Sequence, residues 1–247
     1  MPYWDTRLQL HWAAQAAAGV GRSLLPPQPD SSHESFVWSD EHRALLQGLV
    51  RNMRAGIRLH DMTLIAVDER GAIESEFPMN GRTLAEGFAF FEERARSGPL
   101  KHPPEGMPGH PVAHGAIFDA DLDVLAAMSR HYAEAARTLD DVRRNEEGAG
   151  PLRCWPHHFD LATLITIRGS GEDARTIGVG MAPGDDTYRE PYYYVTPWPY
   201  PRDPAPPPLP NGRWHTNGWF GAVLLVTESA WRAGFLRNAV QYCRTIL

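Results

Sequence analysis

The amino-acid sequence predicts a single α+β domain over residues 1–247, with a mainly antiparallel sheet built from two hairpin units and covered by about four helices. Three observations support this prediction. Apolar residues recur at helical spacing in four long segments, and short apolar runs separated by turn residues form two candidate hairpins. The chain also lacks the regular alternation of strands and helices that a doubly wound parallel sheet requires.

The four helices are expected near residues 6–24, 83–97, 119–143 and 228–245. The second has the clearest beginning, because Thr83 and Glu86 fit a capping box, in which a hydroxyl and a carboxylate satisfy free backbone amides of the first turn. Leu84, Phe88 and Phe91 then form one apolar stripe along that helix.

The first hairpin is expected from Met62 to Phe77, with its turn at Gly71. The second consists of a strand over residues 155–168 and its return through Ile177 to Gly180, and a further strand is expected over residues 218–226. Thr63-Leu64-Ile65 and Thr163-Leu164-Ile165 are alike. An internal duplication, with halves near residues 1–98 and 119–247, therefore remains open.

Composition excludes several classes of function. The net charge of −6 argues against a nucleic-acid surface, which needs clustered positive charge. No apolar run approaches the roughly 20 residues that span a bilayer. Cys154 and Cys243 are the only cysteines and form no CxxC motif, which favours reduced thiols in a cytoplasmic protein. A homodimer through exposed aromatic side chains is left open.

Residues 152–200 and the neighbouring His215 concentrate the unusual chemistry of the chain. If residues 155–168 form a strand, His158 and Asp160 point to the same face of the sheet. Large aromatic side chains with polar tips suit a small organic ligand. We therefore expect small-molecule binding in an aromatic-walled pocket formed by Trp155, His158, Asp160, Glu190, Tyr192, Tyr194, Trp198 and His215.

The same residues allow an enzyme as an alternative. His158, Asp160 and His215 have the residue types and order of the two-histidine, one-carboxylate triad that binds non-haem iron. Without a metal, His158 oriented by Asp160 could act as a general base, assisted by Tyr192 or Tyr194. No Gly-x-Ser-x-Gly elbow accompanies these residues.

A structural or interaction protein is the third reading of the same stretch. Asp185-Asp186, after Pro183-Gly184, is typical of a turn in which Asp side chains bind local amides. The tyrosines and tryptophans would then be large core or interface residues.

The chain resembles an uncharacterised family of bacterial proteins, a domain of unknown function. The resemblance is carried by Trp4-Asp5-Thr6 with Leu8, Leu10-His11 and Gln15, by Pro26-Pro27, by Phe159-Asp160-Leu161-Ala162, and by Glu190-Pro191 followed by aromatic residues. It covers nearly the whole chain. The family has no assigned activity, so the resemblance implies no catalytic roles. Many members have small or polar residues where His157-His158 stand.

Overall fold

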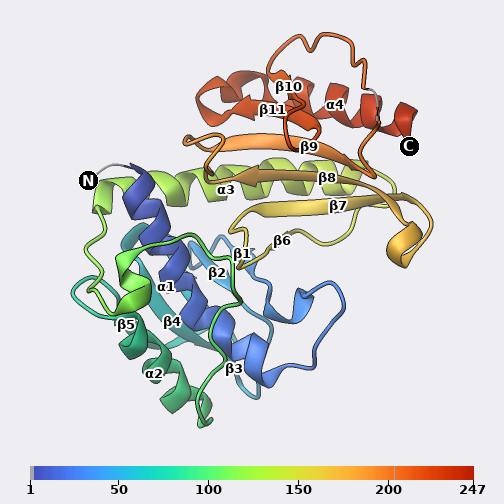
Figure 1. The fold of residues 1–247 in the computed structure, drawn as a ribbon. Helices are drawn as coiled ribbons and strands as arrows, with labels where there is room; N and C mark the ends of the chain where they lie inside the picture. The colour runs from blue at the N-terminus through green and yellow to red at the C-terminus, as the bar shows by residue number, and fades with distance from the viewer. Residues whose placement is uncertain (1–2, 203) are drawn as a thin grey trace. The chain divides into compact units, whose positions relative to one another are not determined.

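The structure is a computed structural model that describes residues 3–202 and 204–247 (Figure 1). Over these residues the chain forms four α-helices and two antiparallel sheets, so the predicted α+β class is confirmed. The two predicted hairpins belong to separate sheets and not to one. No helix of this described part is long and apolar enough to cross a bilayer.

The chain divides into two compact units. Residues 3–133 and 153–159 form the first unit, and the other described residues form the second. The single domain and the internal duplication both stay predictions. The helices are α1 (Tyr3–Leu24), α2 (Leu84–Ala95), α3 (Leu122–Asn145) and α4 (Arg232–Ile246).

The first unit contains one antiparallel sheet in the order β1-β2-β3-β4-β5. Helices α1 and α2 contact each other and the central strands of this sheet. Phe36 pairs with Cys154 of the short strand β6. The strands are β1 (Val37–Ser39), β2 (Ala44–Leu46), β3 (Met53–Arg58), β4 (Thr63–Asp68), β5 (Ile73–Pro78) and β6 (Arg153–Cys154).

Helix α1 is the centre of the first unit, since residues 6–21 of it are all buried. Its buried polar side chains bind backbone groups of distant segments, as burial requires. Gln9 accepts the amide of Asp119 at 2.7 Å. His11 and Gln15 both contact the carbonyl oxygen of Pro156, at 2.6 and 2.8 Å. The helix therefore fixes the segment before β7 by non-local hydrogen bonds.

The second unit contains an antiparallel sheet in which β10, β11, β9, β8 and β7 are neighbours in that order. Helix α4 packs on β8, β9 and β11. Gly180 on β8 is opposite Tyr194 on β9, and the tyrosine ring lies over the glycine. The strands are β7 (Leu161–Arg168), β8 (Arg175–Ala182), β9 (Tyr192–Trp198), β10 (Arg213–His215) and β11 (Gly221–Leu225).

The strand predicted over residues 155–168 is wrong in its first part, because β7 begins only at Leu161. Residues 156–158 form a turn, in which the Phe159 amide donates to the Trp155 carbonyl at 2.7 Å. Phe159 has a φ of 58°, which strand residues do not adopt. The buried Tyr132 hydroxyl donates to the Phe159 carbonyl and holds this turn from α3.

Candidate functional site

The turn before β7 removes the basis for pairing His158 with Asp160. These two residues were predicted to share one strand face, but neither lies in a strand. His158 belongs to the first unit and Asp160 to the second. The His158 ring lies 4.2 Å from that of His157, and the Trp155 indole donates to the Asp30 carbonyl at 3.2 Å.

Four of the predicted site residues do meet in the second unit, together with Tyr188 and Asp185. Aromatic contacts join the rings in sequence, at centroid distances of 5.1 Å for Tyr188 and Tyr192 and 6.3 Å for Tyr192 and Tyr194. Glu190 and Trp198 are exposed. We call the assembled group the tyrosine cluster: Asp160, Asp185, Tyr188, Tyr192, Tyr194 and His215.

Hydrogen bonds satisfy nearly all the polar tips of the tyrosine cluster. The Tyr194 hydroxyl donates to Asp160 Oδ2, and the Tyr192 hydroxyl donates to Asp185 Oδ2 at 2.5 Å. Burial, followed by the hydrogen bond to Asp185, raises the pKa of Tyr192. Asp185 Oδ1 accepts the amides of Thr187 and Tyr188, which is the turn that the sequence predicts. Among the described residues, the buried Asp160 Oδ1 has no hydrogen-bond partner.

The predicted metal triad of His158, Asp160 and His215 is not formed. Both ring nitrogens of His215 are occupied, Nδ1 by the Tyr188 hydroxyl at 3.0 Å and Nε2 by the Asn217 carbonyl at 2.6 Å. Over the residues that the structure describes, no three His, Cys, Asp or Glu side chains are placed to hold a metal ion.

A cavity of about 340 Å³ lies in the first unit and is lined by basic and hydroxyl-bearing side chains. We call it the arginine pocket. Its polar lining residues are Ser32, Ser35, Ser39, Gln47, Arg54 and Arg153, and its other lining residues are Leu25, Val37, Trp38, Leu46 and Gly48. No carboxylate is found among these described lining residues. The volume is within the range of small-molecule sites.

The two arginines differ in how they are held. Arg153 donates to the Ser35 hydroxyl at 3.0 Å. Within residues 3–202 and 204–247, Arg54 has no hydrogen-bond or ion-pair partner and is only half-buried on β3. Nearby acids are used elsewhere, since Glu34 pairs with Arg22 at 2.6 Å and Asp40 accepts the Trp38 indole.

Asp30 is an acid outside the lining whose carboxylate is influenced by the charge of Arg153. Its pKa is lowered mainly by the hydrogen bond from the Ser32 side chain and least by the charge of Arg153. The lining itself contributes two guanidinium groups and, among its described residues, no carboxylate, so the pocket is locally positive in a chain whose net charge is negative.

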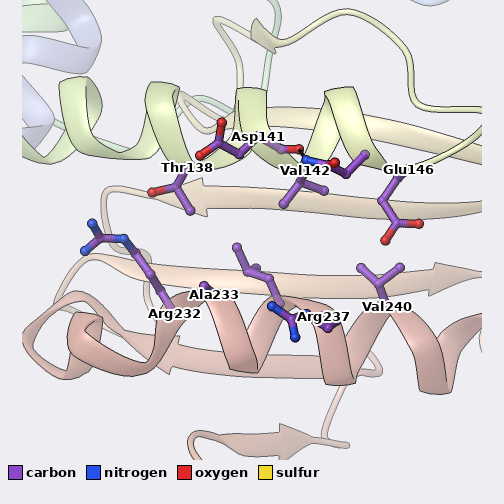
Figure 2. A pocket seen from close by; sticks show the side chains of 10 residues that line it. Thr138, Asp141, Val142, Glu146, Arg232, Ala233, Arg237 and Val240 are labelled. Atoms are coloured by element: carbon purple, nitrogen blue, oxygen red, sulfur yellow. Dashed lines mark hydrogen bonds between the residues drawn. The ribbon is translucent and has the colours of Figure 1, made fainter.

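A second cavity, of about 590 Å³, is a groove between α3 and α4 in the second unit (Figure 2). Two of its charged side chains, Glu146 and Arg232, are paired with neighbours. Glu146 binds Arg244 at 2.8 Å, and Arg232 lies 3.9 Å from Glu134. Its lining is Thr138, Asp141, Val142, Asn145, Glu146, Arg232, Ala233, Leu236, Arg237 and Val240. Because acids and bases face each other across it, this groove favours no single ligand charge.

Sequence reasoning missed the arginine pocket because its residues come from separate short segments. Arg54 and Arg153 are about a hundred positions apart and belong to no local motif. The one signal was Arg54 itself, a cation beside buried residues of a strand, where a charge is costly without a partner or a ligand.

Comparison of the chain with protein-family models, with curated proteins and with solved structures found no match. The resemblance to the bacterial family stays a prediction.

Proposed function

We propose that this protein binds a small organic anion in the arginine pocket. The observation that supports this best is that two guanidinium groups line the pocket and none of its described lining residues carries a carboxylate. Arginine donates several N–H groups in a rigid fork that matches carboxylate and phosphate oxygens. The predicted class, small-molecule binding, is kept, while the site moves from the aromatic stretch to the arginine pocket.

The rest of the lining favours an anion with an apolar portion. The apolar side chains of Val37, Trp38 and Leu46 line the same pocket as the two arginines. Trp38 is held in place by its indole bond to Asp40 at 2.8 Å and by stacking on Tyr132. Fixed aromatic walls bind planar or aliphatic groups at low entropic cost.

Calorimetric titration tests this proposal with succinate, benzoate and inorganic phosphate as probes. Arg54→Gln should weaken binding of the preferred anion by roughly 10- to 150-fold, the equivalent of one charge-assisted hydrogen bond. The matched control is Arg70→Gln, because Arg70 is exposed in the β4–β5 turn and does not line the pocket. Equal affinities of wild type and Arg54→Gln would contradict the proposal.

The tyrosine cluster is a second candidate for small-molecule binding, favoured by one atom. Asp160 Oδ1 is buried and has no partner in the described chain, so it can accept a donor from a ligand. A titration series with small amines and alcohols, run on wild type and Asp160→Asn, tests this candidate. Identical responses of the two proteins would remove it.

A cytoplasmic location and a bacterial origin belong to the same proposal. The cytoplasmic location is supported by Cys154 and Cys243, which are both buried and free, as in proteins of reducing compartments, whereas the bacterial origin rests on the family resemblance alone. The net negative charge of the chain favours a function that does not involve binding of nucleic acid. Light scattering decides between monomer and homodimer.

A further inference from the structure

We infer that the arginine pocket hydrolyses carboxylic esters whose acyl group carries a second anion, with Ser39 as the nucleophile and His42 as the general base. This inference rests on the proposed function, because the pocket must first bind the anionic group. Ser39 ends β1, is only partly buried as a residue, and is one of the residues that line the pocket. An approaching ligand can therefore reach its hydroxyl.

The distance between nucleophile and base suits proton transfer. Ser39 Oγ lies 2.8 Å from Nδ1 of His42. Activated serine nucleophiles and their bases lie within about 2.6–3.2 Å of each other. The His42 amide also contacts Ser39 Oγ at 3.3 Å, so the turn between β1 and β2 holds both groups in one geometry.

A third group sets the tautomer of the His42 ring. Nε2 of His42 lies 2.9 Å from the Gly71 carbonyl oxygen. A carbonyl oxygen only accepts, so Nε2 carries the proton and the neutral ring has its lone pair at Nδ1. Ser39 must then donate its hydroxyl proton to Nδ1. This is the arrangement of nucleophile, base and orienting group found in covalent hydrolases.

The reaction needs only ester and water. Ser39 Oγ bonds to the ester carbonyl carbon while its proton passes to His42 Nδ1. The bond from that carbon to the alcohol oxygen then breaks, and His42 returns the proton to the leaving alcohol. Water attacks the acyl-Ser39 in the same way, giving its proton to His42, and the carboxylic acid leaves as Oγ recovers a proton.

The two arginines supply the positive charge that these reaction steps require. A guanidinium group can hold the second anion of the acyl group, and positive charge at the pocket stabilises the oxyanion of the tetrahedral intermediate. Arg54, without a partner in the described chain, is available to a ligand, whereas Arg153 is positioned by Ser35. Esters that carry an anion should therefore be preferred over neutral ones.

The test compares para-nitrophenyl hydrogen succinate with neutral para-nitrophenyl acetate. Wild type should hydrolyse the succinate ester with the higher kcat/KM. Ser39→Ala and His42→Gln should each lower kcat by at least about 100-fold, the usual contribution of a positioned base. Arg54→Gln should raise KM for the succinate ester alone. The control Ser170→Ala should match wild type, since Ser170 is exposed and outside the pocket.

Two further measurements separate this inference from the proposed function. A fluorophosphonate probe should label Ser39 of wild type, located by mass spectrometry, even if Ser39→Ala folds poorly. Succinate titration of wild type reports binding alone. Bound succinate with neither hydrolysis nor Ser39 labelling would overturn the hydrolase and leave the binding proposal standing. No bound succinate and no hydrolysis would overturn both.

Discussion

Replacing His11 with leucine should remove much of the sensitivity of the protein to mild acid. His11 lies on α1, is fully buried, and stacks on Phe159 with the ring centroids 5.0 Å apart. Burial lowers its pKa from 6.5 to about 3, and the hydrogen bond to Pro156 opposes this shift. The charges of Arg7, His158 and His157 lower it further. The folded protein therefore keeps His11 neutral.

The sign and size of the effect follow from proton linkage. Below pH 6.5 the unfolded chain binds a proton at His11 that the folded chain excludes until about pH 3, so stability falls with pH in this window. At about 1.4 kcal/mol per pKa unit, the loss between about pH 7.5 and about pH 5 is about 2 kcal/mol.

Urea unfolding at these two pH values measures the effect. From about pH 7.5 to about pH 5, the free energy of unfolding should fall by about 2 kcal/mol more in wild type than in His11→Leu. This difference is independent of any stability that the variant loses at neutral pH from its missing bond to Pro156. His114→Leu is the matched control, since His114 is exposed and should keep the wild-type difference. Equal losses in wild type and His11→Leu would refute the reasoning.

Three more predictions concern close contacts and the buried thiol. Gly21→Ala should destabilise the protein by about 1–2 kcal/mol, because a Cβ there would lie 2.4 Å from the His33 carbonyl oxygen. At Gly234 a Cβ would meet open space, so Gly234→Ala should stabilise α4 by up to about 1 kcal/mol. Thermal unfolding of the two variants compares these effects. Gly180→Ala should lower the free energy of unfolding by about 1–3 kcal/mol, since its Cβ would lie 2.6 Å from the Tyr194 ring. Urea unfolding measures this loss, and a change in the near-ultraviolet absorbance of tyrosine would reveal the displaced ring. Burial raises the pKa of Cys243 to about 12, so at about pH 8 iodoacetamide should leave this thiol unmodified in the native protein. After unfolding the thiol should be alkylated, and mass spectrometry measures both states.

Much of the fold could be predicted because its signals are local. The capping box of α2 is present, with Glu86 Oε2 accepting the Thr83 amide at 2.8 Å and the Thr83 hydroxyl accepting the Glu86 amide. The first hairpin is formed by β4 and β5, whose antiparallel pairing runs from Thr63 opposite Pro78 to Val67 opposite Ile73. Helical periodicity and turn residues are properties of short windows, so a single sequence contains them.

The candidate site could not be predicted in the same way, because distant residues determine it. The turn that ends at Phe159 depends on Tyr132, 27 positions away, and on His11 at the Pro156 carbonyl. Apolar alternation through this region favoured a strand, and tertiary hydrogen bonds overrode that local preference. The arginine pocket likewise requires the register of β3 to place Arg54 near Arg153.

We propose that Arg54 and Arg153 together bind a small organic anion. Nuclear magnetic resonance of the arginine Nε–Hε groups tests it most directly, with signals assigned from Arg54→Gln and Arg153→Gln and followed during titration with succinate. We predict that the Arg54 and Arg153 signals shift together and saturate, while those of exposed arginines such as Arg70 stay in place. Equal, non-saturating shifts of all the arginine signals would contradict the claim.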